Sequence, residues 1–205
     1  SDTDTSSVWS DLRMGLQYLK RHPILLSLLG IAFARGFLAM PYRTFMPKYA
    51  QDVMELDATG LGILSAAPGV GSLTSALVMT SLGDFQHKGK VLLSASALTG
   101  VGLALFANTQ TFTLALVWLA IVGAALNICM VTNQTLMQID CEAEYRGRMM
   151  SMYVMAFGLA SLGMLPVGGI ADYMGVTWIL SLQGTLFALA ALSASFLQPK
   201  LRRLE

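Results

Sequence analysis

Charge is scarce in this chain of 205 residues. Asp, Glu, Lys and Arg make up 12% of it, against about 25% in a typical soluble domain, and 55% of the residues are hydrophobic. A chain with so little charge cannot cover a water-facing surface, so the composition predicts an integral membrane protein in a lipid bilayer. The 13 basic residues nearly balance the 12 acidic ones, and no basic patch alternates with aromatics, so we expect no nucleic acid partner.

Cysteine and histidine are rare, and the common catalytic motifs are missing. Two cysteines, Cys129 and Cys141, cannot build a disulfide framework and have no metal-ligand spacing. Both histidines, His22 and His87, stand beside apolar runs rather than inside them. The sequence contains no Gly-x-Ser-x-Gly, no His-Glu-x-x-His and no phosphate-binding Gly-Lys-Ser/Thr. We therefore expect no enzyme activity, no cofactor and no metal site.

Acidic residues are missing from the middle of every apolar run. All twelve lie in tails, loops or the ends of expected helices. A proton-coupled antiporter needs a protonatable side chain in its pathway. Any such carrier would have to come from outside this chain, or the coupling would have to use another ion.

Long apolar runs take the place of charged surface. Each is long enough to cross the hydrocarbon core, about 30 Å thick, as a helix that satisfies its own backbone hydrogen bonds. The runs lie at about 24–50, 59–82, 91–107, 111–139, 149–171 and 176–197. We expect an all-α membrane bundle over 24–197, preceded by a cytoplasmic linker with an amphipathic surface helix (1–23) and followed by a basic cytoplasmic tail (198–205). In the first run, Pro41 and Pro47 predict a kinked or irregular outer third.

Basic residues gather on one side of this expected bundle. Ten lie in the segments assigned to one side, and only Lys48 lies at an outer loop. The ten are Arg13, Lys20, Arg21, Lys88, Lys90, Arg146, Arg148, Lys200, Arg202 and Arg203. The positive-inside rule then predicts that both termini are cytoplasmic. We also expect the membrane to be a bacterial inner membrane.

The six runs form two triplets that repeat at an offset of about 87 residues, and three helices per triplet invert the second copy. We therefore expect two inverted three-helix repeats. Small residues at Ala67, Gly71 and Ser75 recur every four positions in the second run, which predicts a face where another helix approaches closely.

Three stretches resemble one family of transporters. The stretches are Leu12–Pro23, Gly60–Gly71 and Tyr145–Ser151. They are similar to segments at the seventh, eighth and eleventh helices of the major facilitator superfamily, in its enterobactin-exporter and drug-antiporter-like group. The resemblance implies the C-terminal half of a secondary active transporter that exports small amphipathic molecules by alternating access. It also implies an N-terminal six-helix half, or a second copy, as partner. The alternative is a non-transporting six-helix membrane domain, either a stranded fragment or a self-associating scaffold.

Arg35 is the main candidate for the substrate pathway. It lies about 16 Å into the first run, near mid-depth, where an unpaired Arg costs about 3 kcal/mol on insertion scales. It would contact an anionic substrate or pair with the other half. The alternative is a structural bond to backbone carbonyls or snorkelling.

Asn127, Gln134 and Gln138 form a polar stripe along one face of the fourth run, whereas Asn133 lies off that face. The stripe would line the pathway together with Arg35, or it would hold helices together through hydrogen bonds.

Charged inner loops supply a candidate gate. Asp84, Lys88 and Lys90 lie in a loop that resembles the inner-loop motif of the superfamily with altered spacing, and Arg146 and Arg148 lie in the next inner loop. These residues would clamp one transport state, or they would only anchor the bundle by the positive-inside rule.

Overall fold

The computed structural model describes residues 18–19, 21–83, 86–162, 174–198, 201 and 204. Every regular element in this part of the chain is helical. The elements are α2 (Pro23–Ala34), the π-helix η1 (Arg35–Ala39), α3 (Tyr42–Asp52), α4 (Ala58–Leu82), α5 (Lys88–Ala107), α6 (Phe112–Asp140), α7 (Arg146–Leu162) and α9 (Val176–Leu197). The expected linker over 1–17, the second half of the fifth run and most of the tail lie outside the described residues.

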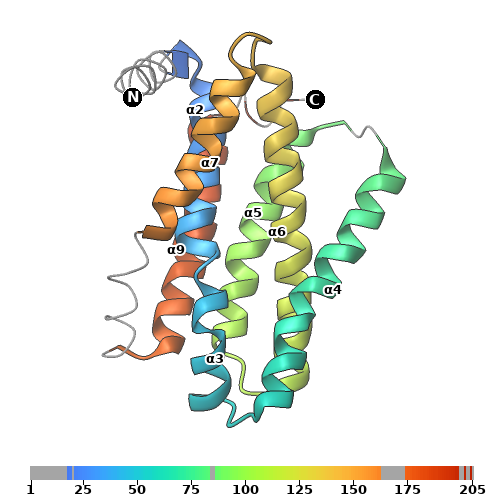
Figure 1. The fold of residues 1–205 in the computed structure, drawn as a ribbon, viewed down its shortest axis with the longest axis vertical. Helices are drawn as coiled ribbons and strands as arrows, with labels where there is room; N and C mark the ends of the chain where they lie inside the picture. Colours follow the sequence, from blue (N-terminus) through green and yellow to red (C-terminus); the bar gives the residue numbers. More distant parts are fainter. Residues whose placement is uncertain are drawn as a thin grey trace, which may run out of the picture.

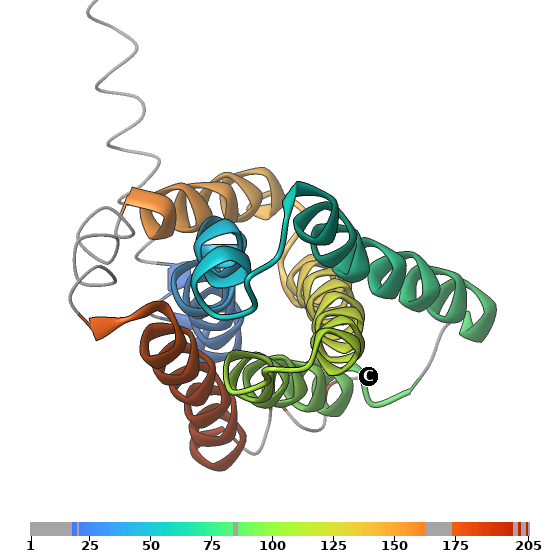
Figure 2. The same cartoon turned by 90° about the horizontal axis from the view of Figure 1, so that it is seen from below.

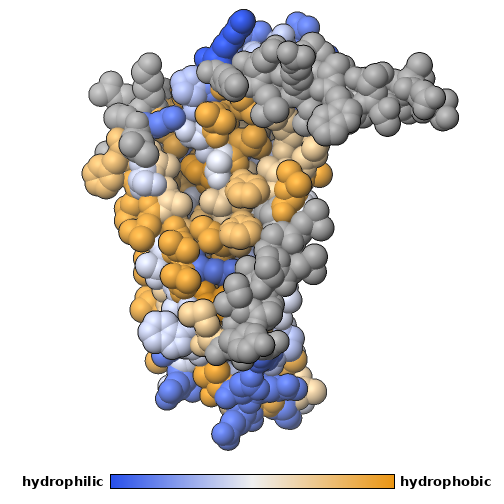
Figure 3. Space-filling model, turned by 90° about the vertical axis from the view of Figure 1, so that its left-hand side faces the viewer, coloured by the Kyte–Doolittle hydropathy of each residue, from blue (hydrophilic) through white to orange (hydrophobic). Residues whose placement is uncertain are grey.

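Five helical stretches among the described residues are long and apolar enough to cross a membrane. They are Pro23–Asp52, Ala58–Leu82, Lys88–Ala107, Phe112–Asp140 and Val176–Phe196. Figure 3 shows the corresponding surface, with hydrophobic residues around the middle of the molecule and hydrophilic residues at its two ends. Large apolar side chains are also exposed on α4, such as Leu77 at 74% exposure, and would be costly in water. The protein is therefore an integral membrane protein, as its composition predicts.

The first membrane stretch changes its helical register just before Pro41. From Arg35 to Ala39 the chain forms a π-turn, in which the Met40 amide donates to the Arg35 carbonyl at 3.0 Å. Pro41 has no amide hydrogen, and its ring would clash with the carbonyl four residues earlier in a regular α-helix. The wider turn absorbs this conflict, and α3 then starts at Tyr42. Pro47 does not end the helix, because α3 continues through it to Asp52.

The helices form a bundle in which α4 lies at one side (Figures 1 and 2). The closest partners are α5 with α9, α4 with α6, and α5 with α6, while α2 packs against α7. In both views α4 leans away from α5 and α6 toward the end where α2 begins. Its Leu73 and Leu77 are among the most exposed apolar side chains of the described residues.

Glycine permits the close contact between α4 and α6. A Cβ atom at Gly71 would overlap the backbone carbonyl of Ala120, and one at Gly123 would overlap that of Pro68. Ala67, Gly71 and Ser75 are all buried on this face of α4. The predicted small-residue packing face is therefore confirmed.

The start of α2 and the end of α9 lie at the same end of the bundle, which we call the terminal end. The Gln198 side-chain amide donates to the Pro23 carbonyl at 3.3 Å. One buried apolar cluster, which includes Leu25, Leu28 and Met149, occupies this half of the bundle. A second cluster around Tyr49, Phe106 and Phe187 fills the half toward α3. Polar side chains between the two clusters are therefore near the middle of the membrane.

Candidate functional site

Arg35 occupies the first position of the π-turn and is only 2% exposed. Its Nη2 donates to the Tyr153 hydroxyl on α7 at 2.7 Å. The guanidinium carbon also lies 5.9 Å from the centroid of the Tyr153 ring, within the range of a cation–π contact. The structure therefore places this cation inside the bundle and does not let it snorkel to the membrane surface. The bond to Tyr153 joins α2 and η1 to α7 across 118 residues of sequence.

Two side chains of α6 approach the same place. Gln134 lies within hydrogen-bonding reach of the Tyr153 hydroxyl, and Cys129 lies within the electrostatic range of Arg35. The Cys129 sulfur is 3.2 Å from the Ser96 hydroxyl on α5. We call these five residues, Arg35, Ser96, Cys129, Gln134 and Tyr153, the midplane cluster. It combines one positive charge with the Gln134 amide and the Tyr153 hydroxyl, and these groups can bind an anionic or carbonyl oxygen. The Ser96 hydroxyl donates to the Leu92 carbonyl of its own helix at 2.7 Å.

The sequence analysis missed three residues of this cluster, Ser96, Cys129 and Tyr153, and of these Tyr153 hydrogen-bonds Arg35 directly. It lies within the methionine-rich start of the fifth apolar run, between Met152 and Met155. A tyrosine inside a membrane helix buries its ring and needs a hydrogen-bond partner for its hydroxyl. This requirement could have identified Tyr153 as a candidate site residue from the sequence. A buried arginine elsewhere in the same bundle is a natural partner, but only the fold shows that the two helices are adjacent.

The polar stripe of α6 is divided between different surroundings. Asn127 donates to the Ser75 hydroxyl at 3.0 Å and to the Ser72 carbonyl at 3.3 Å, so it links α6 to α4. Gln134 faces the Tyr153 hydroxyl, while Gln138 is exposed near the terminal end. Gln134 and Arg35 thus both lie near Tyr153, whereas Asn127 has the contacts of an interhelical link.

Asn133, off the predicted stripe, is one of the most buried polar residues among those described. Its amide donates to the Leu28 carbonyl on α2 at 3.0 Å, but its Oδ1 has no hydrogen-bond partner within the described part of the chain. The same holds for Gln183 Oε1 on α9 and for Thr132 Oγ1. Such acceptors and hydroxyls are expected to bind water or a ligand, because a buried polar atom without a bond costs about 1–3 kcal/mol.

The candidate gate residues that the structure describes lie at the terminal end. Lys88 begins α5 and is buried beside a cavity of about 240 Å³, which Thr80, Thr132 and Gly83 also line. Lys90 is exposed one residue beyond Gly89, whose amide donates to the Leu204 carbonyl at 3.3 Å. Asp84 lies outside the described residues.

The second inner loop holds its two arginines against local groups. Arg146 Nε donates to the Cys141 carbonyl at 3.3 Å, and the Arg148 guanidinium lies 5.8 Å from the centroid of the Tyr145 ring. Burial raises the pKa of the Cys141 thiol, so this group remains protonated at neutral pH. The thiol therefore adds no charge to this loop, in which Arg146 and Arg148 follow Asp140, Glu142 and Glu144.

Comparison with known proteins places these features in a family. Residues 2–164 match the family described as Major Facilitator Superfamily, which covers most of the chain and all of the midplane cluster. The chain belongs to the major facilitator superfamily. It is also 28% identical over 210 residues to a protein of Bacillus subtilis (strain 168) named "Uncharacterized MFS-type transporter YfiS". That alignment covers 92% of this chain and 46% of the relative, so the chain spans about half the length of the curated relative that it matches.

The major facilitator superfamily is a family of membrane transporters. The family match also covers α2 to α7, so Arg35, Gln134 and Tyr153 all lie within it. The buried cation of this superfamily chain thus lies between matched helices, at the depth where transporters place their binding sites.

Proposed function

We propose that this chain is one half of a secondary active transporter that exports small amphipathic molecules, of the drug or siderophore type, by alternating access. Its family and its coverage of 46% of a longer transporter support a second half. That partner is an N-terminal six-helix half or a second copy of this chain. The resemblance of three segments to the enterobactin-exporter and drug-antiporter-like group supports the direction of transport and the class of substrate.

The burial of Arg35 at mid-depth is the observation that carries this proposal. A charged guanidinium near the bilayer centre costs about 3 kcal/mol on insertion scales. Because charged residues at this depth are rare and usually functional, the buried Arg35 supports a role in transport. It also stands at a π-turn, an irregularity that occurs frequently at functional sites. The Tyr153 hydroxyl orients the guanidinium inside the bundle. In this proposal the guanidinium binds a carboxylate, phenolate or carbonyl oxygen of the substrate.

An apolar groove on the helices that Arg35 and Tyr153 connect supports the amphipathic character of the substrate. The groove, of about 420 Å³, lies between α2 and α7 and is lined by Leu26, Phe33, Met152 and Met155. Methionine is unbranched and polarizable, and it adapts to different apolar shapes. The proposed substrate would bind Arg35 through one oxygen-bearing group and place its apolar part against these residues. Many small amphipathic molecules meet both conditions, so the site would accept a class of compounds.

The arrangement proposed for the whole domain keeps six membrane helices over 24–197, arranged as two inverted three-helix repeats. The start of α2 and the end of α9 share the terminal end, which is consistent with an even number of crossings. The basic residues of the inner loops support a cytoplasmic terminal end in a bacterial inner membrane, with segments 1–23 and 198–205 on that side.

At this cytoplasmic end, Asp84, Lys88, Lys90, Arg146 and Arg148 are proposed as a gate. Lys88 and Arg146 begin α5 and α7, and they therefore sit where inner loops meet membrane helices. Opposite charges on the other half would hold the gate closed in one transport state and release it in the other.

A non-transporting, self-associating membrane domain is the second candidate. The exposed apolar face of α4, with Leu73 and Leu77, is the observation that favours it, because such a face can pack against a second copy. The same face also suits contact with lipid or with another half, so it carries less weight than the buried cation.

Substrate flux from vesicles tests the proposed function. In the intact protein we expect Arg35→Ala to lower export of an acidic amphiphile at least tenfold at unchanged membrane levels, because the anchoring charge is lost. Arg35→Lys should retain part of the activity, since the charge remains while the forked geometry is lost. Arg43→Ala is the matched control, because Arg43 lies in the same stretch but is exposed near the opposite end. Equal flux in the Arg35→Ala and Arg43→Ala proteins would remove Arg35 from the pathway.

A further inference from the structure

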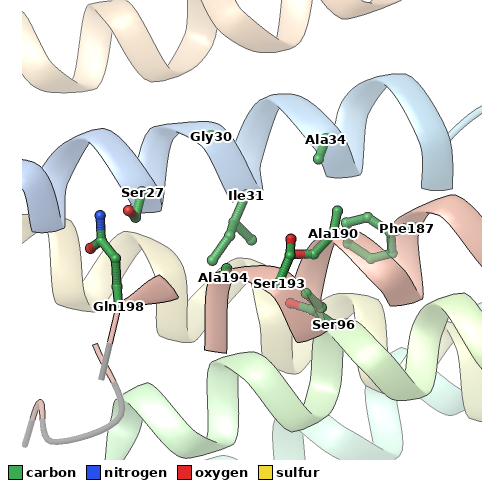
Figure 4. Close-up of a pocket in the computed structure, with 11 residues that line it drawn as sticks. Ser27, Gly30, Ile31, Ala34, Ser96, Phe187, Ala190, Ser193, Ala194 and Gln198 are labelled. Atoms are coloured by element: carbon green, nitrogen blue, oxygen red, sulfur yellow. The ribbon is translucent and has the colours of Figure 1, made fainter. Parts of the chain in front are cut away.

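A slot lies between α2 and α9, on a different side of α2 from the contact with α7. It has a cavity volume of about 250 Å³, and α5 supplies its floor through Ser96. Figure 4 shows the side chains of α2 and α9 that line it, with Ser27 and Gln198 at one end and Ala34 and Phe187 at the other. The first end is the terminal end of the bundle, because Gln198 binds the Pro23 carbonyl there.

Small residues keep the slot open. On α2 the lining positions 27, 30, 31 and 34 follow one helical face, and on α9 positions 187, 190, 191 and 194 do the same. A Cβ atom built at Gly30 would meet nothing within 4 Å, whereas one built at Gly100 would lie 2.6 Å from the Gly184 carbonyl oxygen. Glycine thus brings α5 and α9 into contact, but it leaves space between α2 and α9. Gly30 and Ser193 are exposed, so this space reaches the surface of the bundle.

The walls of the slot are effectively apolar despite their serines. Ser27 donates its hydroxyl proton to the Pro23 carbonyl at 3.1 Å, Ser96 to that of Leu92 at 2.7 Å, and Ser193 to that of Ala190 at 2.9 Å. With their protons used within their own helices, these hydroxyls offer no donor to an anionic group. Ile31, Ala34 and Phe187 supply only apolar surface deeper in the slot. An anionic substrate oxygen is therefore a poor occupant.

We propose that this slot binds one acyl chain of a membrane phospholipid, which enters sideways from the bilayer with its headgroup at the terminal end. The neighbouring surface of α9 is apolar, with Leu189 and Leu192 exposed, so hydrocarbon is the medium that meets the opening. The stretch from Ser27 to Ala34 is about 10 Å long, which suits a chain segment lying along the helices. Apolar cavities of about 150 Å³ already bind benzene, so the volume is sufficient. The residues that line an empty slot lack dispersion contacts on one side, and an acyl chain in the slot would supply those contacts.

The polar end of the slot agrees with this orientation. Gln198 and the Pro23 carbonyl stand where α2 begins and α9 ends, at the level of the membrane surface. The sequence continues from Gln198 to Lys200, Arg202 and Arg203, a basic composition that favours anionic headgroups on that side. The apolar depth and the polar mouth thus match the two parts of one phospholipid.

Photolabelling tests the site in the intact transporter, reconstituted in vesicles of phosphatidylethanolamine and phosphatidylglycerol with a trace of phospholipid that carries a diazirine in its acyl chain. We expect labels on peptides from 27–34 and 187–198 to exceed those on the exposed face of α4 around Leu73 and Leu77 at least threefold. Ala194→Phe and Ser193→Phe, which fill the slot, should remove this excess while the α4 labels stay constant. Leu189→Phe is the control, because it places the same ring on an exposed position of α9.

Three results would overturn the proposal. Labels that are even over all exposed apolar faces would show that the slot holds lipid no better than the rest of the surface. An excess that survives both filling variants in folded protein would place the bound chain elsewhere. Displacement of the label by a transported amphiphile, at concentrations that saturate transport, would assign the slot to the substrate pathway. Because the readout is lipid binding, failure here leaves the transport test at Arg35 unaffected.

Discussion

The bond between Arg35 and Tyr153 combines a charge with a neutral partner. The hydroxyl and the aromatic ring of Tyr153 orient the guanidinium inside the bundle. In the proposed function, a substrate oxygen would take the place of this hydroxyl at Nη2. At the scale of single residues, we therefore expect the midplane cluster to accept an anion or a carbonyl group.

Tyr153→Phe isolates the contribution of the hydroxyl, because it removes the oxygen and keeps the ring. We expect the free energy of unfolding of the intact protein in mixed micelles to fall by about 1–2 kcal/mol, since the buried Arg35 loses an acceptor. Affinity for an acidic substrate should change as well, because the same hydroxyl orients the guanidinium. Denaturant titration and equilibrium binding measure the two effects.

The control for this change is Tyr145→Phe. Tyr145 stacks on Tyr18 with ring centroids 4.2 Å apart at the terminal end, and this contact needs no hydroxyl. It should leave both quantities close to wild type. If Tyr153→Phe were as mild as Tyr145→Phe in both measurements, the hydrogen bond would have no role in the site.

Polar residues also show where residue-level prediction from the sequence stops. The sequence identified Arg35 by depth alone, and the structure buries it inside the bundle. Helical spacing grouped Asn127 with Gln134 correctly on one face, yet it could not say that α4 covers one of them and α7 faces the other. Asn133 looked unremarkable by spacing, but its amide binds a carbonyl of α2, 105 residues away. Such assignments depend on which helices are neighbours, and periodicity carries no information about neighbours.

Among the elements, the π-turn at Arg35–Ala39 and the contact between α4 and α6 define the site most strongly. The prolines predicted an irregular first helix, because a missing amide and a steric clash are local effects. The sequence could not predict that the π-turn begins at Arg35. The helical register at this position also directs the Arg35 side chain toward Tyr153 on α7, and the sequence does not show that α7 is a neighbour. The α4–α6 contact, in contrast, could be predicted from the spacing of small residues, because backbones approach closely only where side chains are absent.

Gly71→Ala and Gly69→Ala form a matched pair that tests the α4–α6 contact. At Gly71 the added methyl group meets the Ala120 carbonyl, so we expect the free energy of unfolding to fall by about 1–3 kcal/mol from overpacking. At Gly69 the methyl group meets nothing within 4 Å, and a gain of up to about 1 kcal/mol is expected from the better helix propensity of alanine. Reversible unfolding of the intact protein in mixed micelles gives both values. Equal effects of the two substitutions would contradict the close contact.

At the scale of the whole molecule, the membrane character and the all-helical architecture followed directly from composition and run length. A chain in hydrocarbon must satisfy its backbone within each segment, so long apolar runs can only become helices. The lean of α4 away from α5 and the slot between α2 and α9 could not be foreseen, because both reflect side-chain volumes at helix contacts that are distant in sequence. The number of crossings and their inverted repeat remain predictions, supported by the family and by the shared terminal end.

The central claim is that the midplane cluster of this superfamily chain lies in a pathway that opens alternately to the two sides of the membrane. Thiol labelling at position 134 tests it most directly, because Gln134 is half-buried beside Tyr153. The measurement uses intact protein with Cys129→Ser, Cys141→Ser and Gln134→Cys, in oriented vesicles treated with a membrane-impermeant maleimide from each side in turn. We predict that the thiol reacts from both sides and that substrate slows the reaction at least fivefold. Reaction from one side only, or from neither, with no effect of substrate would contradict the account.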